Sequence, residues 1–194
     1  SETRTKVVFV PSLTDAVTDF CVLPQPAFDS SLFPPECGVI LAPNPCVIHI
    51  DDGALTVGIT SADIVRHISK HIVISAQHGD RIGTTCEAIV RQHGFYPLHP
   101  TDDSVGIEYS LVEKLSFPGF TPDILVFPSD LNYFAKQVPI TVDRSIPIGG
   151  CPQSSQSTIC VNPGRVAKGN TFGKFCKITA SSRAKSSKVE IFHL

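Results

Sequence analysis

Short apolar runs that stop at proline limit what this 194-residue chain can fold into. The run "KVVFV" over residues 6–10 ends at Pro11, and the run "DILVF" over residues 123–127 ends at Pro128. Each of these prolines is followed by serine. Runs of β-branched and aromatic residues of this length are typical of buried strands, and proline cannot continue a ladder of backbone hydrogen bonds. The chain is therefore predicted to contain many short strands, each ended by a turn.

The same pattern predicts further strands along the chain. Asp52-Gly53 is a tight-turn signal, so we expect the runs on either side of it, at 46–51 and 54–59, to pair as an antiparallel hairpin. Other runs predict strands at 38–43, 157–163, 172–180 and 188–194.

Two segments have the periodicity of helices. Residues 61–72 place Ile64, Ile68 and Ile72 on one face, and Thr60-Ser61 is expected to cap this helix. A second helix is predicted over 81–92, ending at Gly94. This order of elements favours an α/β or α+β fold, with two sheets or one large mixed sheet.

Composition excludes several classes of protein. The hydrophobic fraction is 42% and the charged fraction is 18%, as in globular proteins with a sizeable core. No apolar run approaches the roughly 18 residues of a membrane span, and no secretory signal is recognisable. There is no Met, and the first strand begins almost at once, so we interpret residues 1–194 as a fragment of a longer polypeptide.

Seven cysteines form no CxxC pair. A zinc module or a disulfide framework would need tighter, paired spacing, so we expect reduced thiols in the cytosol or nucleus. The net charge of −2 is unevenly spread: residues 162–194 carry +6 and residues 1–161 carry −8. A dedicated DNA-binding domain usually carries a basic surface throughout, which this chain lacks.

The stretch "CVNPGRVAKGNTFGKFCKI" at 160–178 combines glycines with lysine and arginine. A phosphate-binding loop needs Gly-x4-Gly-Lys-Ser/Thr. Gly164 and Gly169 have the right gap, but Asn170-Thr171 follow them, and Phe175 stands where the second candidate frame needs a hydroxyl. The stretch is therefore predicted to be a turn between two strands.

Other candidates for catalytic or metal chemistry are incomplete. His67 and His71 have the spacing of a zinc-peptidase pair, but Ile68 replaces the general base that should follow the first histidine. Asp102 and Asp103 could bind a cation, although a solvated pair in a loop is more common. None of these residues forms a specific catalytic motif.

Six segments, in order, resemble the accessory B subunits of the replicative eukaryotic DNA polymerases, and most closely their alpha type. The segments are "VVFVPSLTD" (7–15), "LPQPAF" (23–28), "NPCVIHIDDGALTVGITSADIVRHI" (44–68), "IVRQHGFYPLHP" (89–100), "TPDILVFPSDLNYFAK" (121–136) and "CVNPGRVAKGNTFGKFCKI" (160–178). The last resembles an Asn-Pro-Gly-Arg-x-x-Lys-Gly segment that separates the alpha type from its delta and epsilon relatives.

The resemblance implies a calcineurin-like phosphoesterase fold, with two mixed sheets and flanking helices, whose metal site has been lost. Active relatives carry Gly-Asn-His-Asp after one strand, which falls here on residues 12–15, and Gly-His-x-His after another, which falls on residues 128–131. Of these two motifs only Asp15 survives as a metal ligand, and His99 is a candidate remnant of another. One carboxylate and one imidazole cannot organise two metal ions. We therefore assign no catalytic, cofactor-binding or metal-binding residue and expect no cofactor.

The resemblance also implies partners. It predicts a non-catalytic scaffold of the DNA polymerase alpha–primase complex, located in the nucleus and active at the initiation of DNA replication. It would bind the C-terminal zinc-bearing region of the catalytic subunit, and primase only indirectly. Residues 1–194 would form the C-terminal part of the phosphoesterase-like domain, and an oligonucleotide-binding-type domain would lie upstream.

Two alternatives stay open. One is a divergent metallophosphoesterase that uses Asp15, His99 and either Asp102 or Asp103. The other is a nucleic-acid-binding module that binds weakly through the basic C-terminal tail, where Arg165, Lys168 and Lys174 would be exposed.

Overall fold

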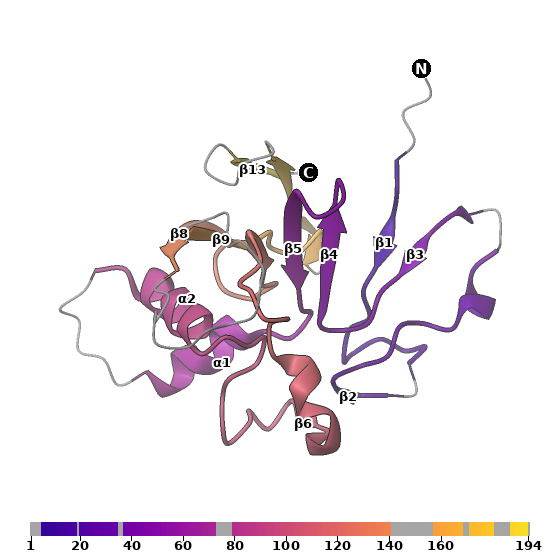
Figure 1. The fold of residues 1–194 in the computed structure, drawn as a ribbon, viewed down its shortest axis with the longest axis horizontal. Helices are drawn as coiled ribbons and strands as arrows, with labels where there is room; N and C mark the ends of the chain where they lie inside the picture. Colours follow the sequence, from indigo (N-terminus) through magenta and orange to yellow (C-terminus); the bar gives the residue numbers. More distant parts are fainter. Residues whose placement is uncertain are drawn as a thin grey trace.

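The computed structural model describes residues 5–18, 20–34, 37–72, 79–140, 157–168, 171–180 and 187–193 (Figure 1). In chain order its elements are β1 (Val8–Phe9), β2 (Val22–Leu23), the 3-10 helix η1 (Ser30–Leu32), β3 (Ile40–Leu41), β4 (Cys46–Ile50), β5 (Leu55–Ile59), α1 (Ile64–His71), α2 (Arg81–Arg91), β6 (Gly106–Ile107), the 3-10 helix η3 (Tyr109–Leu115), β7 (Ile124–Val126), β8 (Phe134–Pro139), β9 (Ser157–Asn162), β10 (Ala167–Lys168), β11 (Thr171–Phe172), β12 (Lys174–Thr179) and β13 (Lys188–His193).

A mixed five-stranded sheet organises the described part of the chain. Its strand order is β4-β5-β7-β9-β8, in which β5, β7 and β9 are parallel and the two outer strands are antiparallel to their neighbours. The remaining strands form two-stranded pairs: β1–β3, β2–β6, β10–β11 and β12–β13. This is a mixed α/β structure with several sheets and few helices, compatible with the predicted α+β class. The expectation of two mixed sheets is corrected to one mixed sheet and four two-stranded pairs among the described residues.

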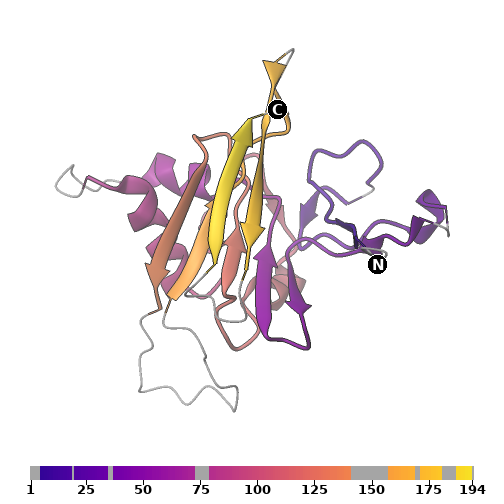
Figure 2. The same ribbon diagram turned by 90° about the horizontal axis from the view of Figure 1, so that it is seen from above.

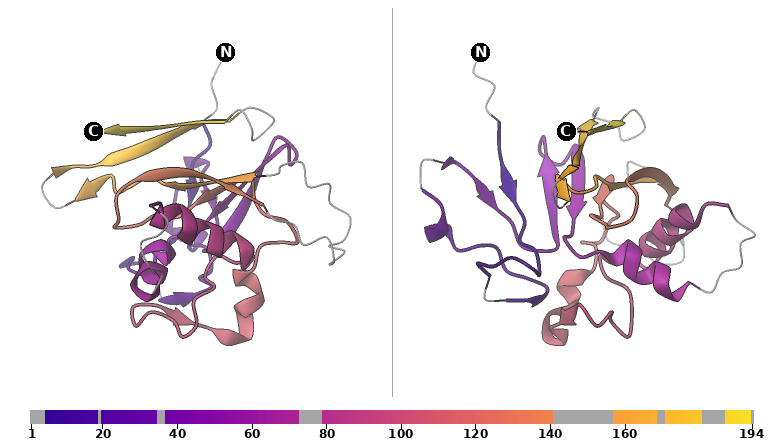
Figure 3. Two further views of the ribbon diagram at one scale, coloured as in Figure 1. Left: turned by 90° about the vertical axis from the view of Figure 1, so that its left-hand side faces the viewer. Right: turned by 180° about the vertical axis from the view of Figure 1, so that it is seen from behind.

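Three layers follow from the alternation of side chains along the central strands. Leu125 of β7 faces α1 and α2, where Ile64 and Ile89 are fully buried. Its neighbour Ile124 points to the opposite face, which the β12–β13 hairpin covers with apolar side chains such as Ile178. The left panel of Figure 3 shows the layers in order, with the hairpin above the sheet and the helices below it, and Figure 2 shows the hairpin lying across the sheet. The central strands of the sheet are thus buried on both faces, as their apolar composition requires.

The predicted hairpin at Asp52-Gly53 is confirmed. β4 and β5 pair antiparallel, from Cys46 opposite Ile59 to Ile50 opposite Leu55. Asp51, Asp52 and Gly53 all have left-handed backbone conformations, with φ of 51°, 53° and 90°. Aspartate and glycine are among the residues that adopt this conformation most readily, so the local sequence determines the turn.

Both predicted helices are present, but their ends differ from the prediction. Asp63, not Thr60 or Ser61, caps α1, and its side chain accepts the backbone N–H of Arg66. Asn44 binds both Thr60 and Ser61, and the helix begins only at Ile64. At the end of α2 the left-handed residue is His93, with φ of 54°, in place of the predicted Gly94.

The first strand differs most from the prediction. β1 has only two residues, and Val7 and Phe9 are 44% and 40% exposed, so it is not the buried strand that its composition indicated. Among the described residues it pairs with β3 alone, in a parallel ribbon beside the central sheet, and it therefore lacks the two covering layers that bury β7.

The six described cysteines are free thiols, as expected from their spacing, and Cys151 lies outside the described residues. Within the described ranges, none of the helices has the length and apolar composition needed to cross a bilayer.

Candidate functional site

The candidate site lies where the three parallel strands end. β5, β7 and β9 run in the same direction, so their carboxyl ends meet at one edge of the sheet. Loops at this edge are where open α/β sheets bind ligands. Here the loops comprise residues 60–63, 127–133 and 163–166, and the loop after β1 is connected to them through side chains.

Asn162, the last residue of β9, connects two of these loops and is fully buried. Its Oδ1 accepts the backbone N–H groups of Ser129 at 3.1 Å and Gly164 at 3.0 Å. Its Nδ2 lies 3.2–3.3 Å from the carbonyl oxygens of Ser129, Leu131 and Asn132. One amide therefore satisfies backbone groups on both the loop after β7 and the loop after β9.

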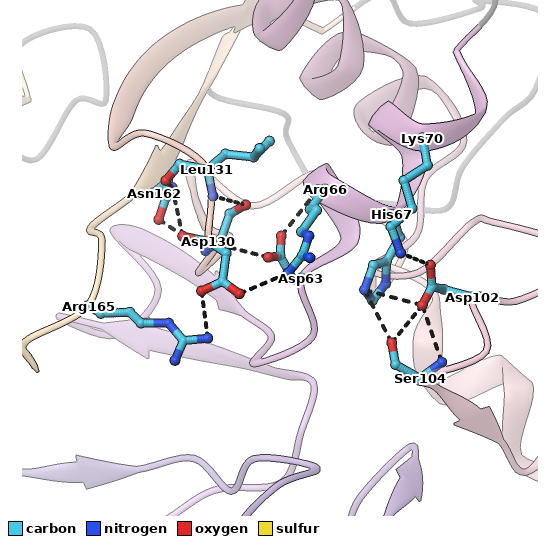
Figure 4. A network of polar contacts seen from close by, with 11 residues as sticks. Asp63, Arg66, His67, Lys70, Asp102, Ser104, Asp130, Leu131, Asn162 and Arg165 are labelled. Carbon is cyan, nitrogen blue, oxygen red and sulfur yellow. Dashed lines mark hydrogen bonds and ion pairs between the residues drawn. The ribbon is translucent and has the colours of Figure 1, made fainter. Parts of the chain in front are cut away.

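Asp130 is held by two arginines at the same edge (Figure 4). Arg66 of α1 places Nη1 at 2.9 Å from one carboxylate oxygen of Asp130, and Arg165 places Nη2 at 2.5 Å from the other. Asp63 accepts the backbone N–H of Asp130 at 2.7 Å. These contacts fasten the loop after β7 to the start of α1 and to the loop after β9.

Asn44, which precedes β4, is a second buried amide, and its side chain binds the two residues that follow β5. Its Nδ2 donates to Ser61 Oγ at 2.6 Å and to Gln25 Oε1 at 3.2 Å. Its Oδ1 accepts the Thr60 hydroxyl at 3.1 Å and the Ser61 N–H at 3.0 Å. Asn44 is 0% exposed, so these bonds replace water completely.

Gln25 extends this network to the loop after β1. Its backbone pairs with that of Asn44, and its Nε2 donates to the Ser12 carbonyl, the Thr18 hydroxyl and the Phe20 carbonyl at 3.1, 3.2 and 2.8 Å. Gln25 is 1% exposed. Three segments distant in sequence are thus connected by two amide side chains.

The residues proposed as metal ligands do not converge. Asp15 accepts the N–H of Ser12 within its own turn at 2.7 Å. His99 lies edge-on to the ring of Tyr109, with centroids 6.3 Å apart, and Asp103 is exposed. In the described ranges no group of three or more His, Cys, Asp or Glu side chains is arranged to hold a metal ion. The donor set at this edge, mainly amides, hydroxyls and paired carboxylates, does not fit a two-metal centre.

His67 and His71 do not form a metal-binding pair. His67 is 7% exposed, and its Nδ1 lies 3.0 Å from the hydroxyl of Tyr96, whereas His71 is exposed at the end of α1. Asp102 forms a salt bridge with Lys70 at 2.5 Å and accepts the hydroxyl of Ser104 at 2.7 Å (Figure 4).

This cluster is not a Ser-His-Asp triad either. The Ser104 hydroxyl donates to Asp102, and the nitrogen of His67 that a triad aspartate would orient faces Tyr96 instead. Lys70 and the Ser104 hydroxyl and N–H hold the pKa of Asp102 well below its usual range. The cluster connects α1 to the segment that follows α2.

We expect His67 to destabilise the fold as the pH falls below about 6.5, the ordinary pKa of histidine. Burial lowers the pKa of His67; Asp102 and Asp63 oppose this shift, and Lys70 and Arg66 add to it. Because the folded state binds the proton less readily than the unfolded chain, stability is retained above this pH and lost below it. His93, whose pKa is also lowered by burial, acts in the same direction.

The measurement is urea unfolding at pH values between 7.5 and 5. The wild-type chain should lose up to about 1.4 kcal/mol per pH unit for each such histidine. His67→Gln should flatten this dependence, and His71→Gln, a change at an exposed position of the same helix, should leave it unchanged. An equal effect of the two substitutions would contradict the assignment.

The glycine- and cation-rich stretch is a connection between strands, as predicted. Gly164 follows β9 with φ of 78°, and the short β10–β11 hairpin leads into β12. The α-carbon of Gly173 packs against the carbonyl oxygens of Arg165 and Val166, so a Cβ there would collide with backbone. Glycine is required for this close approach and not for cradling phosphate.

An apolar hollow of about 970 Å³ lies beside the outer strand β4. Its walls come from β1, β3, β4 and η3 and include Val8, Ile40, Ile48 and Leu111. No sequence pattern indicated this hollow, because it depends on the placement of the β1–β3 ribbon next to the sheet.

Gln25, Asn44 and Asn162 were not predicted from the sequence as functional residues. The sequence does contain a feature that could have identified them: each is a lone amide next to proline, in "LPQP", "APNP" and "VNPG". An amide within a proline-limited apolar stretch is a candidate for satisfying backbone groups that the proline leaves without regular pairing.

The family model and the relatives that match this chain all describe polymerase B subunits. Residues 2–136 match the family model that describes the B subunit of DNA polymerases alpha and epsilon. The B subunit of DNA polymerase alpha from Rattus norvegicus is 33% identical over 187 residues, which is 95% of this chain and 28% of the relative. The proteins of the same name from Dictyostelium discoideum and Schizosaccharomyces pombe are 30% and 28% identical, over 94% and 89% of this chain and 25% and 28% of their own lengths.

The chain thus spans little more than a quarter of the length of the curated relatives it matches. The family model covers well over half of the chain, including β1 to β7 and both helices of the central unit. The chain therefore belongs to the family of DNA polymerase alpha and epsilon B subunits, and its relatives are alpha-type B subunits from animals, fungi and a slime mould.

Proposed function

We propose that this chain is a non-catalytic scaffold of the DNA polymerase alpha–primase complex and acts in the nucleus at the initiation of DNA replication. It binds the C-terminal zinc-bearing region of the catalytic subunit and reaches primase through that subunit. Residues 1–194 form the C-terminal part of an inactivated calcineurin-like phosphoesterase domain, downstream of an oligonucleotide-binding-type domain.

The proposal rests on one observation: the loops at the ends of the parallel strands are fastened to one another by side chains. In an active metallophosphoesterase these loops supply the side chains that hold two metal ions. Here Asn162, Asn44 and Gln25 are buried and fasten the loops to one another, and Asp130 is neutralised by two arginines. Such an edge supports a rigid surface and not hydrolysis.

Family membership supports the cellular role. The relatives are named as B subunits of DNA polymerase alpha, and the similarity covers 89–95% of this chain in the rat, slime mould and fission yeast proteins. A subunit that contributes no chemistry contributes by binding, and the surface of this chain retains exposed apolar side chains such as Ile40, Leu111 and Val112.

Co-expression with the C-terminal region of a polymerase alpha catalytic subunit tests the proposal. The chain, joined to the upstream part of a B subunit from the same family, should co-elute with that region in size-exclusion chromatography as a stoichiometric complex. A matched region from a polymerase of another family serves as the control and should elute separately. Separate elution of two folded partners would contradict the scaffold role.

A further inference from the structure

Aromatic rings lie exposed around a small hollow between the loops after β7 and β9. The hollow has a volume of about 250 Å³ and is lined by Tyr133, Arg165, Phe172 and Lys174, among others. Phe172, on the β10–β11 hairpin, is 88% exposed, and Tyr133 is 43% exposed. The Nζ of Lys174 lies 3.7 Å from the centroid of the Tyr133 ring. Rings and cations therefore meet at one place on the surface.

The outer face of the β12–β13 hairpin carries a second group of exposed rings. Phe175 and Phe192 are cross-strand partners whose rings stack at 5.3 Å, and each is 40% exposed. They point away from the sheet, because the alternate residues Cys176 and Ile178 pack against it. Lys177 follows Phe175 on the same outer face and is exposed.

The two parts lie on opposite sides of the hairpin end, because Lys174 and His193 are on the side of Cys176 and Ile178 and alternate with Phe175 and Phe192. The ring of His193, the residue after Phe192, lies edge-on to Tyr133 with centroids 6.2 Å apart, and His193 pairs with Lys174 across the hairpin. We call the surface that both sides of the hairpin end form together the aromatic–lysine face; it consists of Tyr133, Arg165, Phe172, Lys174, Phe175, Lys177, Lys188 and Phe192.

Charge favours an anionic ligand for this face. Residues 162–194 carry +6, whereas residues 1–161 carry −8. Two acids lie among the cations of the face: Asp130 is bound to Arg165, and Glu190 is bound to Lys188. Lys177 also faces Glu190 across the hairpin, so two lysines share one acid, and Lys174 lies over the Tyr133 ring. The face therefore keeps a net positive charge for a ligand.

We propose that the aromatic–lysine face binds single-stranded nucleic acid. Bases stack on Phe172 and on the Phe175–Phe192 pair, and phosphates lie near Lys174, Lys177 and Arg165. Exposed rings interleaved with cations are the combination that sequence-tolerant single-strand binding uses, since every base has a face that can stack. An acidic protein segment would use the cations and leave Phe172 without a role. This proposal does not depend on the scaffold function.

The test is fluorescence anisotropy with a labelled oligothymidylate of about 12 nucleotides, within the usual site size of such modules. The 194-residue chain should bind it with micromolar affinity at about 50 mM salt, and much more weakly at about 200 mM salt, because binding releases counterions. Phe172→Ala should weaken binding about tenfold. Lys174→Gln should reduce the slope of log affinity against log salt by about 0.7.

Matched controls come from η3, which lies outside the face. Tyr109 is 57% exposed and Lys114 is exposed, so Tyr109→Ala and Lys114→Gln remove similar groups at a distance and should leave affinity and salt slope unchanged. Circular dichroism melting confirms that each variant is folded.

Three outcomes would overturn the proposal: no binding by the folded chain at low salt, equal affinities for Phe172→Ala and Tyr109→Ala, or full displacement by polyglutamate with Phe172→Ala unaffected. The last result would identify the face as a site for an acidic protein.

Discussion

Asn162→Leu should lower the free energy of unfolding by about 3–5 kcal/mol, measured by urea denaturation at 25 °C. Leucine has a similar size but offers no donor or acceptor. The substitution therefore leaves two backbone N–H groups and three carbonyl groups without their partner in a site that is 0% exposed. Each unsatisfied buried group costs about 1–3 kcal/mol, and relaxation of the loops recovers part of the sum.

Asn132→Leu is the matched control, because it makes the same chemical change at an exposed position of the loop that Asn162 holds. Surface substitutions of this kind usually change stability by less than about 0.5 kcal/mol. If Asn162→Leu were as mild as Asn132→Leu, the loops after β7 and β9 would be held by something other than the Asn162 amide.

Asn44→Leu should destabilise the fold by about 3 kcal/mol, and Gln25→Leu by about 2–3 kcal/mol, because each change strands the polar partners of a buried amide. The two side chains share a hydrogen bond of 3.2 Å and a backbone bridge. The double variant should therefore lose less than the sum, with a coupling energy of about 1 kcal/mol.

The control for this double-mutant cycle is Gln92→Leu, a change at an exposed residue at the end of α2. Combined with Asn44→Leu it should give additive effects. Additivity in the Asn44–Gln25 pair as well would show that the loop after β1 is not energetically connected to the end of β5.

Elements defined by local patterns could be predicted from the sequence. The β4–β5 hairpin follows from Asp52-Gly53, and the strands β7, β9, β12 and β13 follow from short apolar runs. Even the helix ends were displaced by only a few residues. These features depend on interactions between neighbours in the chain, which a sequence pattern records directly.

Features set by distant contacts could not be predicted. Thr60 and Ser61 were expected to cap α1, but Asn44, which is 16–17 residues earlier, binds both of them, and the cap is Asp63. The same holds for Asn162, whose partners in the loop after β7 lie 30–33 residues away. Hydrogen bonds of this range depend on how strands are placed in the sheet, which composition does not specify.

The sequence bears on metal binding at the candidate site only through the chemistry of its side chains. Serine, leucine, threonine and proline at residues 12–14 and 128–129 are poor ligands for hard cations. The positive role of the edge, in which amides and an arginine-bound aspartate hold the loops together, required the structure.

Thermal unfolding in the presence of Mn²⁺ tests this role most directly. A ligand that binds the folded state raises the melting temperature in a concentration-dependent way, because it shifts the unfolding equilibrium by mass action. We predict the same melting temperature in EDTA and in Mn²⁺, for the wild-type chain and for Asp15→Ala alike. A saturable rise in the wild-type chain that Asp15→Ala abolishes would contradict a scaffold built from a lost metal site and would favour a divergent metallophosphoesterase.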